Sequence, residues 1–459
     1  MINSVADFQS PFFIGVAGTG MSALAQYLQG TGKQVSGSDR NFVSGVINET
    51  KEKLEAEGIH CFPQTGEGIT AHTDLVVVST AIEDTVEEVV KAKQLGIPIM
   101  RRSALLALIA ESKKSIAVGG TSGKSTTSAM IYEILCHAGY DPGIISGAGL
   151  TRLIKEGKIG NAAVGKGDWL VIEADESDGS IVQYKPEVGV LLNIDKDHQE
   201  IDELISLFDT FKKNTRSFFV VNQSQALAGQ LSANAAWNFS INMHDDAAYH
   251  AADYQQKGFQ SSFTINSIPF QLLSPGKHNM ENALAATAIA NLIGIPIEKS
   301  AQALSKYEGI YRRHQVLGSK KGIWVVDDYA HNPAKCAAAI AACQPVSKKV
   351  VAWFQPHGYG PTKFLKNDFI EEFAKVLRPE DEIWMSEIYY AGGTAVKDIS
   401  AKDLTDVLSE RGVRAYFVED RNKLLDAMRS HLSEDTVLLL MGARDPGLEA
   451  FTKGVWDQL

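Results

Sequence analysis

The chain has 459 residues, of which 44% are hydrophobic and 22% charged, and its formal net charge is -11. This length predicts roughly two to four domains, and the acidic balance argues against nucleic-acid partners. No apolar run approaches the roughly 18 residues of a membrane helix, and residues 1–10 lack a secretory-signal pattern, so no membrane partner is expected. Cys61, Cys136, Cys336 and Cys343 are interpreted as small core residues, which fits a cytoplasmic protein.

Alternating strand and helix signals predict three α/β units along the chain. The expected strands are 12–16, 74–78, 97–100, 115–119, 169–173, 188–193, 323–326, 350–354, 382–385, 415–418 and 437–441, with antiparallel strands within 237–273. The expected helices include 21–30, 103–111, 280–292, 298–304, 369–377 and 422–432. Strands separated by helices favour open parallel sheets. The domain limits are expected at 1–108, 109–311 and 312–459.

The segment 120–126, Gly-Thr-Ser-Gly-Lys-Ser-Thr, lies between a predicted strand and a predicted helix. Backbone N–H groups at a helix N-terminus favour a polyphosphate. Lys124 adds a positive charge for the outer phosphates, and the Ser125 hydroxyl can bind Mg²⁺. Counted from Gly119, the loop is one residue shorter than the strict G-x-x-x-x-G-K-[ST] pattern. Because the chain lacks the Asn-Lys-x-Asp motif that reads guanine, ATP is the expected nucleotide.

Acidic side chains follow the strand at 169–173, in the segment Glu173-Ala-Asp-Glu-Ser-Asp178. A carboxylate at a strand end beside a phosphate loop is where Mg²⁺ is usually held, although a solvated acidic loop is the alternative. His198 follows the next strand, and ligands collect at the carboxyl ends of parallel strands. We therefore expect Glu173 and His198 to face the same crevice as Lys124.

A second glycine-rich turn, Gly18-Thr19-Gly20 with Ala23, follows the first strand, and Asp39 lies about twenty residues further on. This pattern is typical of dinucleotide sites, so a nicotinamide-dependent oxidoreductase is one interpretation. Any pyrophosphate can use the same turn, so a nucleotide sugar is the other. A third interpretation is that the glycines serve only the close packing of the helix on the strand and bind no ligand.

Polar groups cluster at four further places: 275–282, 311–313, 327–333 and 354–359. Asn279 and Asn282 share a helix face, and Arg313 could reach a transferring phosphoryl group. The last two segments end predicted strands, where polar side chains line clefts. The structural alternative is a helix cap for 275–282 and a solvated basic linker for 311–313. For 327–333 and 354–359 it is the ordinary polarity of loops.

With these blocks in order, the chain resembles the Mur ligases, the ATP-dependent amide-forming enzymes of peptidoglycan precursor synthesis. The matching blocks are 15–25, 37–39, 120–126, 173–178, 193–198, 276–279, 312–313, 328–333 and 354–357. The family tolerates the short phosphate loop. The resemblance implies a Rossmann-like first domain, a central P-loop ATPase-like α/β domain and a Rossmann-like third domain that binds the amino compound.

The resemblance also assigns roles to residues. ATP contacts are expected at Gly120, Thr121, Ser122, Gly123, Lys124, Ser125, Thr126, Asn279, Asn282, Arg313 and Asp328. Mg²⁺ ligands are expected at Ser125, Glu173 and His198, and catalytic roles at Lys124, Glu173, His198 and Arg313. Contacts to a UDP-N-acetylmuramate-type nucleotide sugar and an amino acid or peptide are expected at Gly18, Thr19, Gly20, Met21, Ser22, Asp39, His331 and His357.

The expected reaction joins the carboxylate of UDP-N-acetylmuramate to an amino acid, L-alanine first, through an acyl phosphate. A ligase that recycles murein tripeptide onto the same UDP-sugar is the nearest alternative. The chain departs from the alanine-joining pattern in several places: Ser122 replaces histidine, Gly358 replaces arginine, and Ala330 and Asn332 alter the third-domain histidine block. The segment 441–445, Met-Gly-Ala-Arg-Asp, also differs from the expected glycine-rich end. Most of these changes lie in the third domain, which helps to select the incoming amine.

Overall fold

The computed structural model describes the chain except residues 1, 44, 196–199, 391 and 393–395. Its described residues form two compact units. The first comprises residues 1–253, 263–270 and 281–310, and the second comprises 254–262, 271–280 and 311–459. No helix among the described residues is long and apolar enough to cross a membrane.

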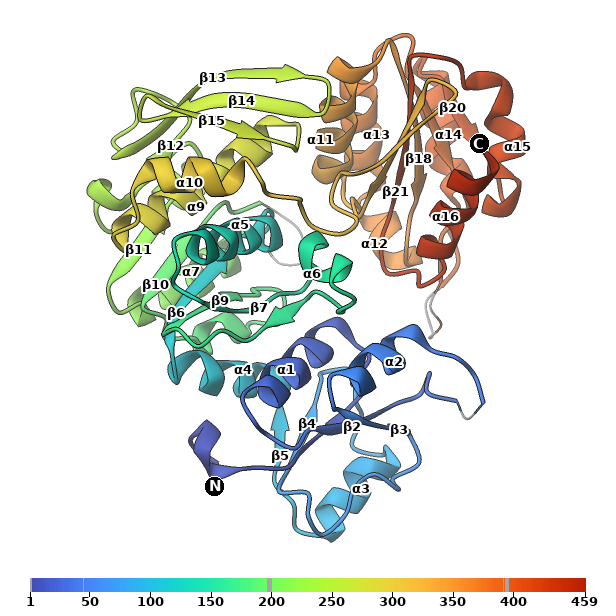
Figure 1. Cartoon of the computed structure of the whole chain (residues 1–459). Coiled ribbons are helices and arrows are strands. Elements are labelled where there is room, and N and C mark those ends of the chain that lie inside the picture. The colour runs from blue at the N-terminus through green and yellow to red at the C-terminus, as the bar shows by residue number, and fades with distance from the viewer. Residues whose placement is uncertain (1, 44, 196–199, 391, 393–395) are drawn as a thin grey trace. The chain divides into compact units, whose positions relative to one another are not determined.

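The first sheet has the order β3-β2-β1-β4-β5 and is parallel throughout. Its strands are β1 (Pro11–Ile14), β2 (Ser36–Asp39), β3 (His60–Pro63), β4 (Leu75–Val78) and β5 (Ile99–Arg101). Helices α1 (Thr19–Gly30) and α2 (Glu49–Ala56) pack on the face that carries Phe13 and Val77, and α3 (Glu87–Gln94) packs on the opposite face (Figure 1). The strand order reverses at β1, which places the glycine-rich turn at the topological switch point.

The second sheet has the order β11-β10-β6-β9-β7-β8, with only β7 and β8 antiparallel among its printed pairs. Its strands are β6 (Lys114–Gly119), β7 (Gly143–Ile145), β8 (Ala162–Ala163), β9 (Trp169–Glu173), β10 (Val188–Leu191) and β11 (Phe218–Val221). The helices around it are α4 (Arg102–Glu111), α5 (Lys124–His137), α6 (Thr151–Lys155), α7 (Ile201–Asn214) and α8 (Ala226–Gly229). Because β6 lies between β9 and β10, the loop after β6 is flanked by both strand ends.

A smaller sheet has the order β12-β13-β14-β15. It comprises β12 (Phe239–Ser240), β13 (Tyr249–Lys257), β14 (Gln260–Ile265) and β15 (Ile268–Leu272), and the helices α9 (Lys277–Leu292) and α10 (Ile297–Leu304) follow it. Antiparallel strands were expected here, but β12 and β13 pair in parallel. Residues 222–238, which contain α8 (Ala226–Gly229) and a 3₁₀ turn at Ala235–Trp237, separate β11 from the two-residue β12.

The sheet of residues 315–442 has the order β16-β17-β21-β18-β19-β20, and only β16 runs antiparallel to its neighbour. Its strands are β16 (Gln315–Lys320), β17 (Ile323–Asp328), β18 (Lys349–Gln355), β19 (Glu382–Met385), β20 (Ala415–Phe417) and β21 (Thr436–Gly442). The helices are α11 (Pro333–Cys343), α12 (Tyr359–Phe364), α13 (Lys366–Val376), α14 (Ala401–Glu410), α15 (Leu424–Met428) and α16 (Leu448–Gln458). Side chains of β18 alternate, so Phe354 packs toward α13 and Trp353 toward α16. The ribbon shows α13 and α16 beside this sheet (Figure 1). This sheet is buried on both faces, as parallel sheets are.

Candidate active site

The loop 120–126 joins β6 to α5 through two glycines in left-handed backbone conformations. Gly120 has φ +133°, and Gly123, the N-cap of α5, has φ +85°. A Cβ atom on Gly123 would lie 2.6 Å from the Oδ1 atom of Asn282. Both the backbone angle and the close approach therefore require glycine at this position. The first N–H groups of the 14-residue helix α5 are left for a ligand.

Asn193, two residues after the end of β10, holds this loop in place. Its Oδ1 atom accepts hydrogen bonds from the Ser122 N–H (2.8 Å) and the Thr121 hydroxyl (2.9 Å), and its Nδ2 donates to the Ser122 carbonyl (3.1 Å). The segment 193–198 is one of the blocks that match the family, but the sequence predicts no role for Asn193 itself. The signal that could have identified Asn193 is its position at the end of a buried strand beside the loop.

Lys124 lies among carboxylates at the start of α5. Its Nζ atom is 2.7 Å from Glu176 Oε2 and donates to the Gly120 carbonyl, also at 2.7 Å. Burial by itself lowers the pKa of Lys124, but the charges of Glu176, Asp175 and Glu173 outweigh it, so the pKa is raised. Lys124 therefore carries a positive charge at physiological pH.

Glu173 and Ser125 bring two oxygen donors together beside Lys124. The Ser125 hydroxyl donates to Glu173 Oε2 at 3.0 Å, while Glu173 Oε1 accepts from the Ser146 hydroxyl and the Gly147 N–H, both at 2.6 Å. A carboxylate and a hydroxyl at hydrogen-bond distance suit the hard oxygen coordination of Mg²⁺. Among the described residues, no group of three or more His, Cys, Asp or Glu side chains could hold a metal ion. His198, the third expected ligand, lies outside the described residues.

The glycine-rich turn after β1 exposes Gly18 and Thr19, whereas the side chains of Met21 and Ser22 are buried. Backbone groups of the turn are thus its accessible part. Asp39 at the end of β2 accepts from the Ala17 N–H at 3.1 Å, so it fixes the turn. Gly20, next to the two exposed residues, is half-buried.

The two asparagines of α9 have separate contacts. Asn279 donates to the Pro275 carbonyl (2.7 Å) and stabilises the turn before the helix. The Asn282 Oδ1 atom accepts from the Thr127 hydroxyl (3.1 Å) and lies against Gly123. Asn282 thus shapes the phosphate loop, whether or not it also contacts a base.

Two neighbouring arginines at 312 and 313 have different surroundings. Arg312 is buried and bonds to Asp327 (2.9 Å) and to the Gly442 carbonyl (3.1 Å). Both guanidinium groups also lie over the Tyr329 ring, at 5.6 Å from its centre for Arg312 and 4.9 Å for Arg313. Arg312 thus joins β17 to β21, whereas Arg313 is half-buried.

The carboxyl end of β17 also carries Asp328 and His331. Asp328 accepts from the backbone N–H groups of His314 (2.6 Å) and Ala330 (2.7 Å), and burial raises its pKa to about 6. The His331 and His357 ring centres are 5.7 Å apart. Burial and the nearby Lys335 lower the pKa of His331 to about 3, so its imidazole is neutral at physiological pH.

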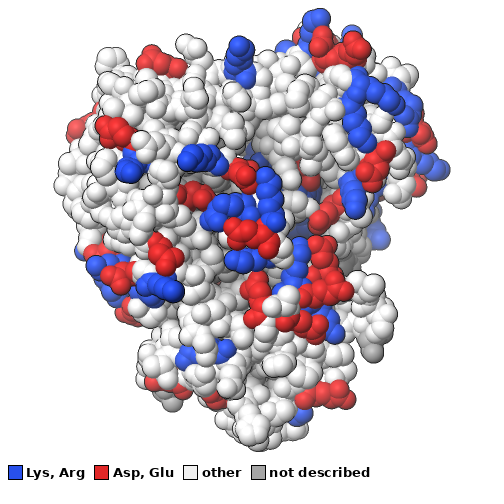
Figure 2. Space-filling view, in the orientation of Figure 1, with Lys and Arg blue, Asp and Glu red and all other residues white. Residues whose placement is uncertain are grey.

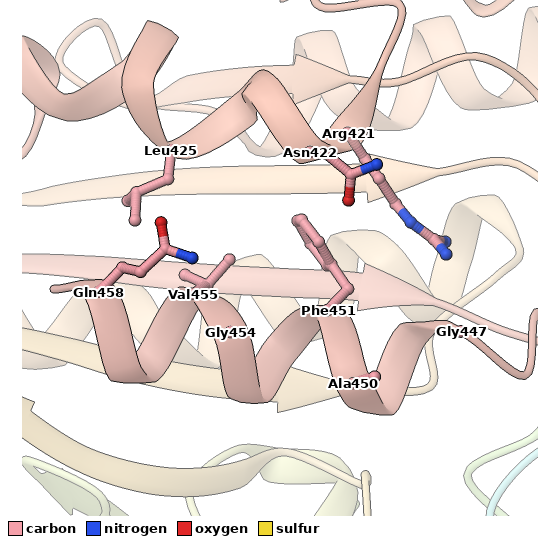
Figure 3. A pocket seen from close by; sticks show the side chains of 9 residues that line it. All are labelled: Arg421, Asn422, Leu425, Gly447, Ala450, Phe451, Gly454, Val455 and Gln458. Atoms are coloured by element: carbon pink, nitrogen blue, oxygen red, sulfur yellow. The ribbon is translucent and has the colours of Figure 1, made fainter.

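Two surface features lie apart from the predicted residues. Lysine, arginine and carboxylate side chains intermingle on the face shown in Figure 2, without the single-sign stripe that nucleic acid favours. A pocket of about 390 Å³ lies between α16 and the segment 421–425 (Figure 3). None of the predicted site residues lines this pocket.

Open, mostly parallel sheets and a glycine-rich turn at the start of α5 define the class: a multidomain α/β protein of the phosphate-loop type. Family models match in order, with the Mur ligase catalytic domain at residues 12–114, the Mur ligase middle domain at 118–290 and the Mur ligase glutamate ligase domain at 312–444. The chain belongs to the Mur ligase family.

Individual relatives agree with this family. The UDP-N-acetylmuramate–L-alanine ligase of Carboxydothermus hydrogenoformans is 35% identical over 448 residues, covering 94% of this chain and 93% of that protein. The enzyme of the same name from Caldanaerobacter subterraneus is 36% identical and covers 95% of each chain. A solved UDP-N-acetylmuramate–alanine ligase from Thermotoga maritima superposes with a TM-score of 0.80 at 26% identity over 98% of both chains. A murein peptide ligase from Psychrobacter arcticus, with a TM-score of 0.67 at 20% identity over 98% of both chains, shares the fold.

These matches confirm the resemblance and the expected three-domain α/β fold. The limits at 108/109 and 311/312 stay predictions, and α4 (Arg102–Glu111) runs across the first of them.

Proposed function

We propose that this protein uses ATP to join the carboxylate of UDP-N-acetylmuramate to the amino group of an amino acid, L-alanine first. The named relatives support the two substrates. The arrangement of Lys124, Ser125 and Glu173 around the phosphate loop is the observation that carries the ATP-dependent step. A cytoplasmic location, where ATP and the nucleotide sugar are made, belongs to the same proposal.

In this mechanism the sugar carboxylate attacks the γ-phosphate of ATP, and ADP leaves. The amine then attacks the acyl phosphate, and inorganic phosphate departs from the tetrahedral intermediate. Lys124 neutralises the outer phosphates, and the N–H groups of the loop orient them. Ser125 and Glu173 would hold Mg²⁺, which neutralises phosphate charge when bound. Gly18, Thr19 and Gly20 are proposed to bind the UDP diphosphate.

Residues of the second unit complete the assignment. Arg313 is proposed to contact the transferring phosphoryl group, and Asp328 the ribose of ATP. His357 and the neutral His331 are proposed to orient the amine, because an uncharged imidazole nitrogen can accept a hydrogen bond from it. His198 keeps its proposed role as a metal-positioning residue.

The test is an ADP-release screen in which UDP-N-acetylmuramate is combined with single amino acids and with murein peptides. ADP is expected in a 1:1 ratio with an amide product, and only when both substrates are present. Preference for the peptide would favour the murein-recycling reaction, and equal ADP release without either substrate would refute the ligase.

Lys124→Ala is the second arm of this screen. We expect kcat to fall at least about 100-fold, since charge stabilisation of the transferring group is lost. Lys155→Ala removes an exposed ion pair with Glu308 (3.0 Å) and serves as the matched control. Near-normal turnover in Lys124→Ala, with the control unchanged, would contradict the role of Lys124.

A further inference from the structure

Arg444, directly after β21, occupies a strained turn that glycine would adopt freely. Its φ is +63°, and the Asp445 N–H donates to the Ala443 carbonyl at 2.8 Å. A hydrogen bond between residues i and i+2 with a positive φ at the central residue is the rarer and more strained form of γ-turn. Residues other than glycine that are held in such strained conformations cluster at functional sites.

The Arg444 side chain is exposed, and within the described residues its guanidinium forms neither a hydrogen bond nor an ion pair. Neighbouring arginines differ in this respect. Arg312 is paired with Asp327, and Arg421 bonds to Asp445 and to Gln355 (2.8 Å). Asp327 and Asp445 are thus each paired with another arginine, and no ion pair is formed by Arg444 in the described part of the chain.

The sheet order places this charge in the middle of the strand-end residues already described. β21 lies between β17 and β18, with Met441 beside Asp328 and Gly442 beside Gln355. The Arg444 N–H donates to the Tyr329 hydroxyl at 3.3 Å. The loop after β18 reads Pro-His-Gly-Tyr-Gly over 356–360 and supplies no arginine of its own.

We propose that Arg444 binds the α-carboxylate of the incoming amino acid and makes the enzyme select amino acids over amines that lack this group. The inference rests on the proposed function, because it concerns the second substrate of that reaction. A guanidinium matches a carboxylate with two parallel hydrogen bonds, and such charge-assisted pairs are stronger than neutral ones. Arg444 is thereby a specificity-determining residue that acts in binding and leaves the phosphoryl-transfer step unchanged.

The experiment compares wild type, Arg444→Gly and Arg444→Lys with L-alanine and with L-alaninamide, whose carboxylate is replaced by a neutral amide. We expect Arg444→Gly to raise KM for L-alanine roughly 10- to 100-fold, with kcat and KM for ATP within about twofold. Its preference for L-alanine over the amide should disappear, and Arg444→Lys should retain part of it. The Tm of Arg444→Gly should not fall, because glycine fits the turn.

The control is Arg411→Ala, which removes an exposed arginine that pairs with Glu371 (2.6 Å) on another part of the unit. Binding of L-alanine is also titrated in the presence of the UDP-sugar and a non-hydrolysable ATP analogue. Arg444-dependent binding without ADP release would refute the proposed function and leave the inference standing. Binding or KM of Arg444→Gly within threefold of wild type, an unchanged preference, or no binding of L-alanine to wild type would overturn the inference.

Discussion

Asp328 illustrates how surroundings set the properties of a single residue. Two backbone N–H groups hold its carboxylate at the end of β17, and Arg313 favours its charged form. Burial nevertheless dominates and raises the pKa from 3.8 to about 6. The folded protein therefore binds a proton at Asp328 more tightly than the unfolded chain does.

This pKa predicts a pH-dependent contribution to stability. The contribution is complete below pH 3.8 and is lost as the pH rises through about 6. Asp328→Asn keeps an acceptor oxygen but cannot ionise. The difference in unfolding free energy between wild type and the variant should change by up to about 3 kcal/mol between pH 4 and 7, in favour of the variant at the higher pH.

Urea titrations at several pH values measure this difference. Asp84→Asn, which alters a carboxylate whose side chain is 88% exposed, is the control. A difference between wild type and Asp328→Asn that does not vary with pH would contradict the assignment.

At the scale of elements, the two ends of α5 offer a comparison. Gly123 at the N-terminus and Gly139 beyond the C-terminus have φ values of +85° and +83°. A Cβ at Gly123 meets Asn282, whereas nothing lies within 4 Å of a Cβ at Gly139. An alanine at either position would therefore have a strained backbone, but only an alanine at Gly123, in the phosphate loop, would also overlap with a neighbouring side chain.

Gly139→Ala should reduce the unfolding free energy by about 1 to 2 kcal/mol, the strain of a left-handed alanine. Gly123→Ala should lose about 1 to 3 kcal/mol more because Asn282 must move. Gly123→Ala should also lose the thermal stabilisation by ATP that Gly139→Ala retains, as differential scanning fluorimetry would reveal. If both variants lost the same unfolding free energy, the overlap with Asn282 would be relieved without disturbing the loop, which would contradict this prediction.

At the scale of the whole molecule, a buried polar network joins the residues around the first sheet (β1–β5) to those around the second sheet (β6–β11). Both sheets belong to the first unit. Asn161 is fully buried and donates to the Thr19 carbonyl (2.7 Å) and the Ser22 hydroxyl (3.0 Å), and its Oδ1 accepts from Gln26 (2.8 Å). These partners belong to the first turns of α1. The proposed UDP-sugar turn is thereby tied to the region of the second sheet, where ATP is proposed to bind.

Asn161→Ala should lower the unfolding free energy by about 2 to 3 kcal/mol, since buried donors and acceptors lose their partners. Hydrogen exchange at the amides of α1 should accelerate more than exchange in β6 and β10, because the connection between the two regions is weakened. Asn291→Ala removes bonds to Tyr249 (3.0 Å) and Ile295 (3.1 Å) inside the central region and should not have this selective effect. Uniform acceleration across both regions would contradict the proposed connection.

The sequence by itself determined the α/β class, the strands that end in polar segments and the order of motifs that identifies the family. These features are local, since glycines, apolar runs and spacing act within a few residues. The parallel arrangement then placed Lys124 and Glu173 at one sheet edge, as expected.

Only the tertiary structure decided which partners these residues have. Lys124 pairs with Glu176 and Asn193 locks the loop because three strands distant in sequence are adjacent in the sheet. Arg312 and Arg313 look equivalent in sequence, yet one is buried against Asp327 and the other is not. Long-range packing sets burial and charge neighbours, and these contacts cannot be deduced from spacing along the chain.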